Sequence, residues 1–170
     1  MMKNTLMAAV AFLALTGTAL AADPVKADRS GFYAGGSLGS STDEKSRIDL
    51  GVNAGYQFGS YVRAEVDVDH AWKTHGDGNM LTGNVIGQYR IPNSTVTPYV
   101  LVGAGYGFDK LGSLKGGAAT PVGNVGAGVR IGLSESVDLD FRYREVRALR
   151  DLNASNKQLH LFSAGVDYRF

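Results

Sequence analysis

Apolar and polar residues alternate with a period of two along most of the chain after residue 30. In residues 48–58 the apolar residues of one face are Ile48, Leu50, Val52, Ala54, Tyr56 and Phe58, with Asp49, Gly51, Asn53, Gly55 and Gln57 between them. The same alternation recurs in residues 61–73, 137–144 and 162–170. It is typical of a strand with one apolar and one polar face, and no segment keeps a helical period over three turns. The sequence therefore predicts an all-β fold.

Eight segments carry this pattern, and each has the roughly 9 to 11 residues that a tilted strand needs to cross a bilayer. They are residues 30–40, 48–59, 61–74, 80–91, 96–110, 121–134, 137–149 and 158–170. The separators alternate between tight turns (59–60, 92–95, 134–136) and longer polar loops (41–47, 75–79, 111–120, 150–157). Short turns at one end and longer loops at the other are the layout of outer-membrane barrels. We expect an eight-stranded antiparallel up-and-down transmembrane β-barrel.

The first residues predict an export signal. Lys3 provides the positive start, Met7 to Leu15 form a short apolar run, and Ala19-Leu20-Ala21 fits a small-x-small cleavage site. The apolar run is shorter than the roughly 20 residues of a membrane helix. We expect residues 1–21 to be a cleavable signal peptide, residues 22–29 a periplasmic N-terminal lead, and residues 30–170 the barrel domain.

Composition narrows the function classes. Without the expected signal peptide, 16 basic and 16 acidic residues remain, a balance that gives no indication of nucleic-acid binding. The chain has no cysteine, so an exported fold must rely on a core or on a membrane instead of disulfides. Glycine accounts for 23 of 170 residues, roughly twice the usual share of about 7%.

A soluble sandwich or a lipocalin-like barrel is the main alternative, because both also have one polar and one apolar face. In a soluble barrel the charged face would point outward. The short turns and the terminal aromatic residue favour the membrane barrel, whose charged face points into the lumen. Two belts of aromatic residues are expected at the membrane interfaces. We assign Phe32, Tyr56, Phe58, Tyr61, Tyr89, Tyr99, Tyr168 and Phe170 to the short-turn belt, and Trp72, Tyr106, Phe108, Tyr143 and Phe162 to the other.

Several segments resemble those of small outer-membrane barrels. The opening Ser30-Gly31-Phe32-Tyr33-Ala34-Gly35-Gly36 is similar to the first strand of surface-antigen barrels, and Pro98-Tyr99-Val100 and Val137 to Tyr143 are similar to later strands of the neisserial surface protein A group. The final strand ends in Phe170, with Val166 and Tyr168 on the same face. Together these motifs resemble the opacity-type, outer membrane protein A-like superfamily over residues 30–170.

The resemblance implies a location in the outer membrane of Gram-negative bacteria, among outer-membrane lipid and lipopolysaccharide. It also implies that Val166, Tyr168 and Phe170 form a C-terminal signal read by the barrel assembly machinery. Opacity adhesins carry long outer loops, whereas the loops here are short, which weakens a host-receptor interpretation. The chain stops at Phe170, so we do not expect the peptidoglycan-binding domain of full-length outer membrane protein A.

Twelve charged residues fall on the polar face of the predicted strands, and an eight-stranded barrel is just wide enough to be filled by side chains. They are Arg63, Glu65, Asp67, Asp69, Arg90, Arg130, Asp138, Asp140, Arg142, Arg144, Asp167 and Arg169. Six acids against six bases predict a neutral ion-pair network that plugs the lumen, because buried charges must be paired. The alternative is a narrow ion path or gate, as in a low-conductance porin.

No catalytic, cofactor-binding or metal-binding residues are predicted. Glycines at 103, 105, 107, 126, 128 and 132 have no following helix, so they do not form a dinucleotide site, and we expect them to leave room for arginines. Some barrels of this size are lipid A-modifying enzymes with a His-Ser pair. His160 and Ser163 are three residues apart and so point to opposite sides of a strand. His70, His75 and His160 lack metal-ligand spacing.

Half of the mature basic residues lie at the long-loop end of the predicted barrel. They are Lys45, Arg47, Lys73, Lys110, Lys115, Arg147, Arg150 and Lys157. They are candidate contacts for lipopolysaccharide phosphates, since basic side chains near an anionic membrane surface gain about 1 kcal/mol each. A solvated rim is the alternative. The sequence as a whole predicts a non-enzymatic outer-membrane barrel with a structural or surface-interaction role, and it does not identify a surface ligand.

Overall fold

The computed structural model describes residues 30–42, 47–72, 78–109, 119–149 and 158–170. It contains eight β-strands: β1 (Gly31–Thr42), β2 (Arg47–Phe58), β3 (Val62–Trp72), β4 (Gly78–Gln88), β5 (Val96–Asp109), β6 (Thr120–Gly132), β7 (Val137–Ala148) and β8 (Gln158–Arg169). Each strand pairs antiparallel with the next, and β8 pairs with β1, so the sheet closes. The predicted eight-stranded up-and-down barrel is confirmed. In the described part of the chain, no helix is long and apolar enough to cross a membrane.

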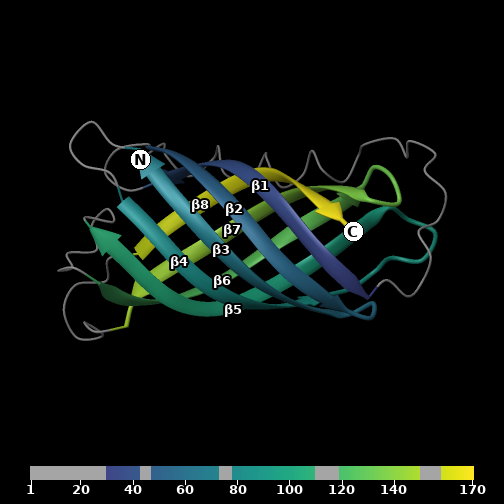
Figure 1. Ribbon diagram of the computed structural model, residues 1–170, viewed down its shortest axis with the longest axis horizontal. Helices are drawn as coiled ribbons and strands as arrows, with labels where there is room; N and C mark the ends of the chain where they lie inside the picture. Colours follow the sequence, from purple (N-terminus) through teal and green to yellow (C-terminus); the bar gives the residue numbers. More distant parts are fainter. Residues whose placement is uncertain (1–29, 43–46, 73–77, 110–118, 150–157) are drawn as a thin grey trace, which may run out of the picture.

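The strands run obliquely around the barrel axis (Figure 1). The connections β2–β3, β4–β5 and β6–β7 are the short turns predicted from the sequence, and they lie at the same end as the C-terminus (Figure 1). We call this the short-turn end. The opposite end, where β1, β3, β5 and β7 finish, is called the loop end. The four connections there lie largely outside the described residues.

The turns explain where the strands stop. In the β6–β7 turn, the amides of Leu133 and Ser134 both donate to the carbonyl of Val137, so β6 ends at Gly132 and not at residue 134 as predicted. In the β4–β5 turn, Asn93 takes a positive φ of 57° directly after Pro92. Strand β4 accordingly ends at Gln88, three residues earlier than predicted.

Burial alternates along the strands in the sense expected for a membrane barrel. In β3 the charged residues are buried, whereas the neighbouring Val66 and Val68 expose 52% and 44% of their surface. On β2, β4 and β5 the outward face is likewise apolar and exposed, as at Val52, Val85, Val100 and Val102. Since the polar face lines the lumen and the apolar face points outward, the arrangement is opposite to that of a soluble barrel.

Outward aromatic residues gather toward both ends. Phe32, Tyr56 and Phe58 form a contacting row at the short-turn end, with ring centroids 4.9 and 4.8 Å apart. Toward the loop end, the Tyr143 and Phe162 rings lie 4.9 Å apart. The assignment of Tyr99 to the outer belt was wrong, because Tyr99 points into the lumen and is only 4% exposed. Apolar residues occupy both faces of β5 at this point, so alternation does not identify its inward side.

Candidate functional site

The charged residues of the lumen come mainly from two strands that face each other. In a closed barrel of eight strands, β3 and β7 are separated by three strands on either side, so they lie opposite one another across the lumen. From the short-turn end toward the loop end, β3 presents Arg63, Glu65, Asp67 and Asp69, and β7 presents Asp138, Asp140, Arg142 and Arg144. The basic residue comes first on β3 and the basic residues come last on β7, so Arg63 meets Asp138 while Glu65 and Asp69 meet Arg142 and Arg144.

Ion pairs cross the full width of the lumen at three levels. Arg63 Nη2 lies 3.5 Å from Asp138 Oδ2 near the short turns. Arg142 Nη1 lies 2.6 Å from Glu65 Oε1 farther along the axis. Arg144 Nη2 lies 2.7 Å from Asp69 Oδ1 nearest the loop end. Each pair joins β3 to β7, so the pairs act as struts between opposite walls.

Further ion pairs link these struts into one network. Asp167 on β8 contacts both Arg63, at 3.3 Å, and Arg130, at 3.6 Å. Asp140 contacts Arg130 at 3.2 Å and Arg142 at 3.4 Å. The remaining links are Arg169–Asp138 at 2.6 Å, Arg142–Asp67 at 3.3 Å and Arg144–Asp67 at 3.7 Å. Eleven of the twelve predicted residues are therefore connected, all with buried or nearly buried side chains.

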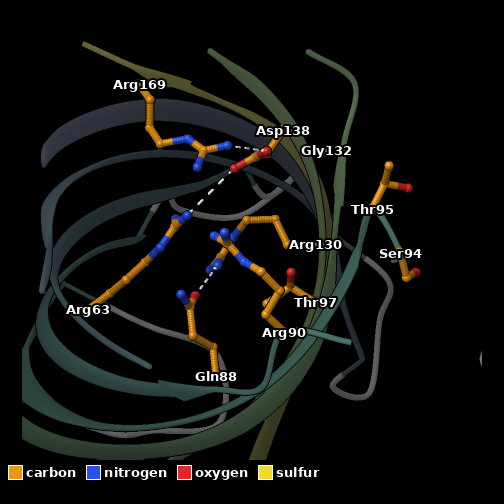
Figure 2. Close-up of a pocket in the computed structure, with 10 residues that line it drawn as sticks. All are labelled: Arg63, Gln88, Arg90, Ser94, Thr95, Thr97, Arg130, Gly132, Asp138 and Arg169. Carbon is orange, nitrogen blue, oxygen red and sulfur yellow. Dashed lines mark hydrogen bonds and ion pairs between the residues drawn. The ribbon is translucent and has the colours of Figure 1, made fainter. Parts of the chain in front are cut away.

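The twelfth predicted residue, Arg90, lies beyond the end of β4 in the β4–β5 turn. It is half-buried and lines a pocket at the short-turn end together with Arg63, Arg130 and Arg169 (Figure 2). The structure thus places all twelve residues in the lumen or at its short-turn opening.

Two lumen tyrosines belong to the same network and were missed by the sequence reasoning. Tyr33 donates to Glu65 Oε2 at 2.9 Å, and the Arg63 guanidinium lies 4.4 Å from its ring centroid. Tyr99 donates to Asp140 Oδ1 at 2.7 Å, and Arg130 lies 4.7 Å from its ring. Each tyrosine therefore combines a hydrogen bond to a carboxylate with a cation–π contact.

A glycine on the neighbouring strand makes room for each tyrosine ring. Tyr33 is directly paired with Gly55, and Tyr99 with Gly128. A Cβ atom on Gly55 would lie 2.7 Å from Tyr33 Cζ, and one on Gly128 would lie 2.4 Å from Tyr99 Cζ. The expectation that inward glycines leave room for arginines applies only at Gly126, where a Cβ would meet the Tyr143 carbonyl and lie 3.1 Å from Arg144 Cγ; at Gly103 it would meet Asn84 instead. The pairing of a tyrosine with an inward glycine is the signal that could have identified these sites.

Neutral amides satisfy much of the remaining hydrogen-bonding capacity. Asn53 donates to both Glu65 and Asp167, at 3.1 and 3.0 Å. Asn84 donates to Asp67. The carbonyl oxygens of Gln57 and Gln88 accept from Arg63 and Arg130, at 2.9 and 2.7 Å. These amides hold the guanidinium and carboxylate groups in orientation, which a buried ion pair requires if it is to offset its loss of hydration.

Toward the loop end, part of the lumen wall is apolar, which the sequence did not predict. Five buried side chains from β4, β6, β7 and β8 form a cluster there, at most 6% exposed. They are Met80, Val122, Val146, Leu159 and Leu161, with Ala148 packed against them. We call these residues the apolar cluster.

The His-Ser pair considered for enzyme chemistry does not form. His160 accompanies Tyr143 on the outward face, with its Nδ1 2.8 Å from the Tyr143 hydroxyl. Ser163 lies on the inward face and lines a small space beside Arg142. His75 lies outside the described residues, and within them no group of histidine and acidic residues could hold a metal ion.

Most of the predicted basic rim lies outside the residues that the structure describes. Arg147 is the member whose side chain is described: it is 57% exposed and lies 2.5 Å from Glu145. Arg47 is the first residue of β2, and its side chain lies outside the described residues. The other members lie wholly outside them: Lys45, Lys73, Lys110, Lys115, Arg150 and Lys157. The predicted signal peptide and lead, residues 1–29, also lie outside them. At the C-terminus, Val166, Tyr168 and Phe170 all point outward.

Comparisons with known proteins agree with this architecture. Residues 7–170 match the family described as outer membrane protein beta-barrel domain. The N-terminal β-barrel domain of Pseudomonas aeruginosa OprF has a TM-score of 0.63 at 16% identity, covering 84% of this chain and all of that one. Neisserial surface protein A has a TM-score of 0.64 at 20% identity, covering 83% of this chain and 97% of its own.

The outer membrane enzyme PagL is also similar, with a TM-score of 0.53 at 12% identity, covering 81% of this chain and 99% of that one. Likenesses at these identities show the fold. A search of curated proteins found no significant match. In outer-membrane barrels the short turns face the periplasm, which makes the short-turn end periplasmic. The chain belongs to the outer membrane protein β-barrel family and is an integral protein of the bacterial outer membrane.

Proposed function

We propose that this protein is a non-enzymatic barrel with a structural or surface-interaction role, and that its ion-pair network plugs the lumen. The observation that carries the proposal is the set of struts between β3 and β7, represented by Arg142–Glu65 at 2.6 Å and Arg144–Asp69 at 2.7 Å. Because the struts span the lumen, an ion cannot pass along the axis without separating them.

The energetics support a closed lumen. Breaking a buried ion pair by removing one partner costs about 3–5 kcal/mol, since the other charge stays buried. The space beside the Arg142 strut is only about 10 Å³, room for about one water molecule. The apolar cluster adds a stretch of lumen wall whose side chains cannot replace an ion's hydration. Both sections oppose conduction.

Conductance in planar bilayers tests this proposal. The native barrel, checked for insertion by its heat-dependent mobility on a gel, should give no steps above the background of the empty bilayer. A variant carrying Glu65→Ala, Asp67→Ala, Arg142→Ala and Arg144→Ala, folded by the same gel test, should give small steps where the native barrel gives none, because two of the three strut levels are removed. The matched control is Arg147→Ala, which removes an exposed outward charge. Steady single-channel steps from the native protein would make a narrow, low-conductance porin the better account.

Absence of enzyme activity is a separate part of the proposal. It is supported by the placement of His160 and Ser163 on opposite faces of β8. Mass spectrometry of lipid A from cells with and without the protein should give identical spectra. Loss of an acyl chain from lipid A would favour a lipid A-modifying enzyme. The similar fold of the outer membrane enzyme PagL is the reason for testing this class.

The surface-interaction role concerns the basic residues near the loop end. We propose that some of them contact lipopolysaccharide phosphates, supported by their number in the sequence and by the exposed Arg147. Binding to intact lipopolysaccharide should exceed binding to a dephosphorylated form. Equal binding would favour a merely solvated rim.

Two steps of biogenesis are proposed from the chain ends. Residues 1–21 act as a cleavable signal peptide, residues 22–29 form a periplasmic lead, and N-terminal sequencing of the exported protein should begin at Ala22. The outward Val166, Tyr168 and Phe170 act as the signal for the barrel assembly machinery. Deleting Phe170 should lower the amount of folded barrel in the outer membrane without changing synthesis.

A further inference from the structure

The periplasmic opening of the lumen contains a pocket that the closed network does not account for. Four arginines line it, together with Gln88, Thr97 and Asp138. The arginines are Arg63, Arg90, Arg130 and Arg169, and their side chains point toward a shared space (Figure 2). Arg63 lies on β3, Arg90 in the β4–β5 turn, Arg130 on β6 and Arg169 on β8, so the four side chains approach this space from several sides.

The walls of this pocket are mainly cationic. Asp138, Asp140 and Asp167 are the acids that the network pairs with Arg63, Arg130 and Arg169. Of these three acids only Asp138 lines the pocket, whereas all four arginines do. The pocket therefore presents several guanidinium groups and one carboxylate to its shared space.

A buried donor also remains available in this pocket. Arg130 is only 2% exposed, its Nε donates to Asp140 at 3.2 Å and its Nη1 to Gln88 at 2.7 Å. Among the contacts of the described residues, its Nη2 has no hydrogen-bond partner. Leaving a buried charged donor unsatisfied is costly, so a position of this kind favours an acceptor.

We propose that the periplasmic opening binds one phosphate group. Guanidinium groups bind phosphate oxygens by paired, charge-assisted hydrogen bonds. Donors that converge from several strands fit a tetrahedral oxyanion better than a planar carboxylate. The pocket is small and lies at the opening of the lumen, so a small anionic group can reach its arginines and a large ligand cannot enter it. The site does not depend on whether the lumen conducts, because it lies at the opening and not along the plugged section.

The phosphate can come from a soluble phosphate in the periplasm or from the headgroup of a phospholipid in the inner leaflet. Titration calorimetry of the full barrel in octyl glucoside, a detergent without phosphate, tests the site directly. Inorganic phosphate is titrated at constant chloride, and binding should saturate at one phosphate per barrel. Dihexanoyl phosphatidylglycerol is titrated in a second experiment to compare the two sources.

Arg90→Gln is the informative variant, because Arg90 is half-buried in a turn and lies outside the struts. It should weaken phosphate binding about tenfold, the effect of losing one charge-assisted hydrogen bond. Gly87→Ala, on the outward face of β4 where a Cβ has room, is the control and should leave binding unchanged. Arg130→Lys keeps the charge but removes Nη2, so it should also weaken binding. Heat-dependent gel mobility establishes that each variant is folded.

Each outcome decides the proposal. Saturable phosphate binding that depends on Arg90 supports it. Tighter binding of the short lipid, with the same dependence on Arg90, also supports it and identifies the source as a lipid headgroup. The proposal fails if neither ligand saturates, or if Arg90→Gln binds phosphate as tightly as the native barrel.

Discussion

The lumen is filled in two different ways along its axis. From the periplasmic turns to the level of Asp69, buried guanidinium and carboxylate groups pair across the diameter. Toward the loop end, the apolar cluster replaces them with packed aliphatic side chains. The ionic section requires a particular partner on the opposite wall, whereas the apolar section requires only the right volume. We therefore expect the ionic section to specify how the walls are aligned, and the apolar section to tolerate any alignment that fills its volume.

The order of charges explains this difference. Moving β7 by two residues toward the loop end would bring Asp140 to the level of Glu65, where Arg142 now pairs. Two carboxylates would then face each other in a buried space, which is strongly unfavourable. Aliphatic side chains carry no such restriction, and volume-conserving exchanges among them are well tolerated. The predictions below test whether the two sections respond differently to substitution.

The largest effect is expected for Arg142→Met. This change leaves Glu65, Asp67 and Asp140 buried without the guanidinium that contacts all three. The free energy of unfolding should fall by about 3–5 kcal/mol. Urea-induced unfolding in lipid vesicles measures it, and Arg147→Met should change it by less than about 0.5 kcal/mol. A loss below 1 kcal/mol for Arg142→Met would mean that the struts contribute little.

In the apolar cluster, the response should depend on volume. Leu159→Ala removes a fully buried side chain and should cost about 2–5 kcal/mol. Leu159→Met keeps the volume and should cost less than about 1.5 kcal/mol. The same unfolding measurement compares them. Equal losses for both variants would contradict a section that depends on volume alone.

A smaller effect is expected where a glycine accommodates a tyrosine ring. In Gly128→Ala, the new methyl group would overlap the Tyr99 ring and the Phe141 carbonyl oxygen, so the ring must shift from its contacts with Asp140 and Arg130 and the strand backbone must adjust. The cost should be about 1–3 kcal/mol. Gly87→Ala is the matched control, since the nearest atom to its Cβ is 3.9 Å away, and it should be within about 0.5 kcal/mol of the native barrel. An unchanged free energy of unfolding for Gly128→Ala would show that the Tyr99 ring can move aside without loss of stability.

The smallest effect is expected for Tyr33→Phe. The ring stays over Gly55 and beside Arg63, and only the hydroxyl that donates to Glu65 is lost. Because Glu65 keeps Arg142 and Asn53 as donors, unfolding should become easier by about 1 kcal/mol. A loss as large as that of Arg142→Met would place Tyr33 among the principal supports of the network.

The sequence predicted much of the fold because alternation with period two has a simple cause. Where one face meets lipid and the other carries charges, as in β3 and β7, the pattern identifies both faces. It fails where both faces are apolar. Met80 and Leu81 are adjacent, yet one is buried in the lumen and the other is exposed. The inward Tyr99 is surrounded by apolar neighbours in the same way, and this is why it was assigned to the outer belt.

The candidate site was predictable in composition but not in geometry. The twelve charged residues could be identified from their place on the polar face. Their partners depend on which strands lie opposite, and that follows only once eight strands are known to close with β3 facing β7. The amides and tyrosines that orient the charges are uncharged, so a search for balanced charge did not find them. The role of the basic residues near the loop end stays a prediction.

A double-mutant cycle between Glu65 on β3 and Arg142 on β7 tests the central claim most directly. Urea unfolding is measured for the native barrel, Glu65→Gln, Arg142→Met and the double variant. If the pair acts as a strut across the lumen, the two changes should not be additive, with a coupling free energy above about 1.5 kcal/mol. Additivity within about 0.5 kcal/mol would contradict the account, because the two residues would then stabilise the barrel independently of each other.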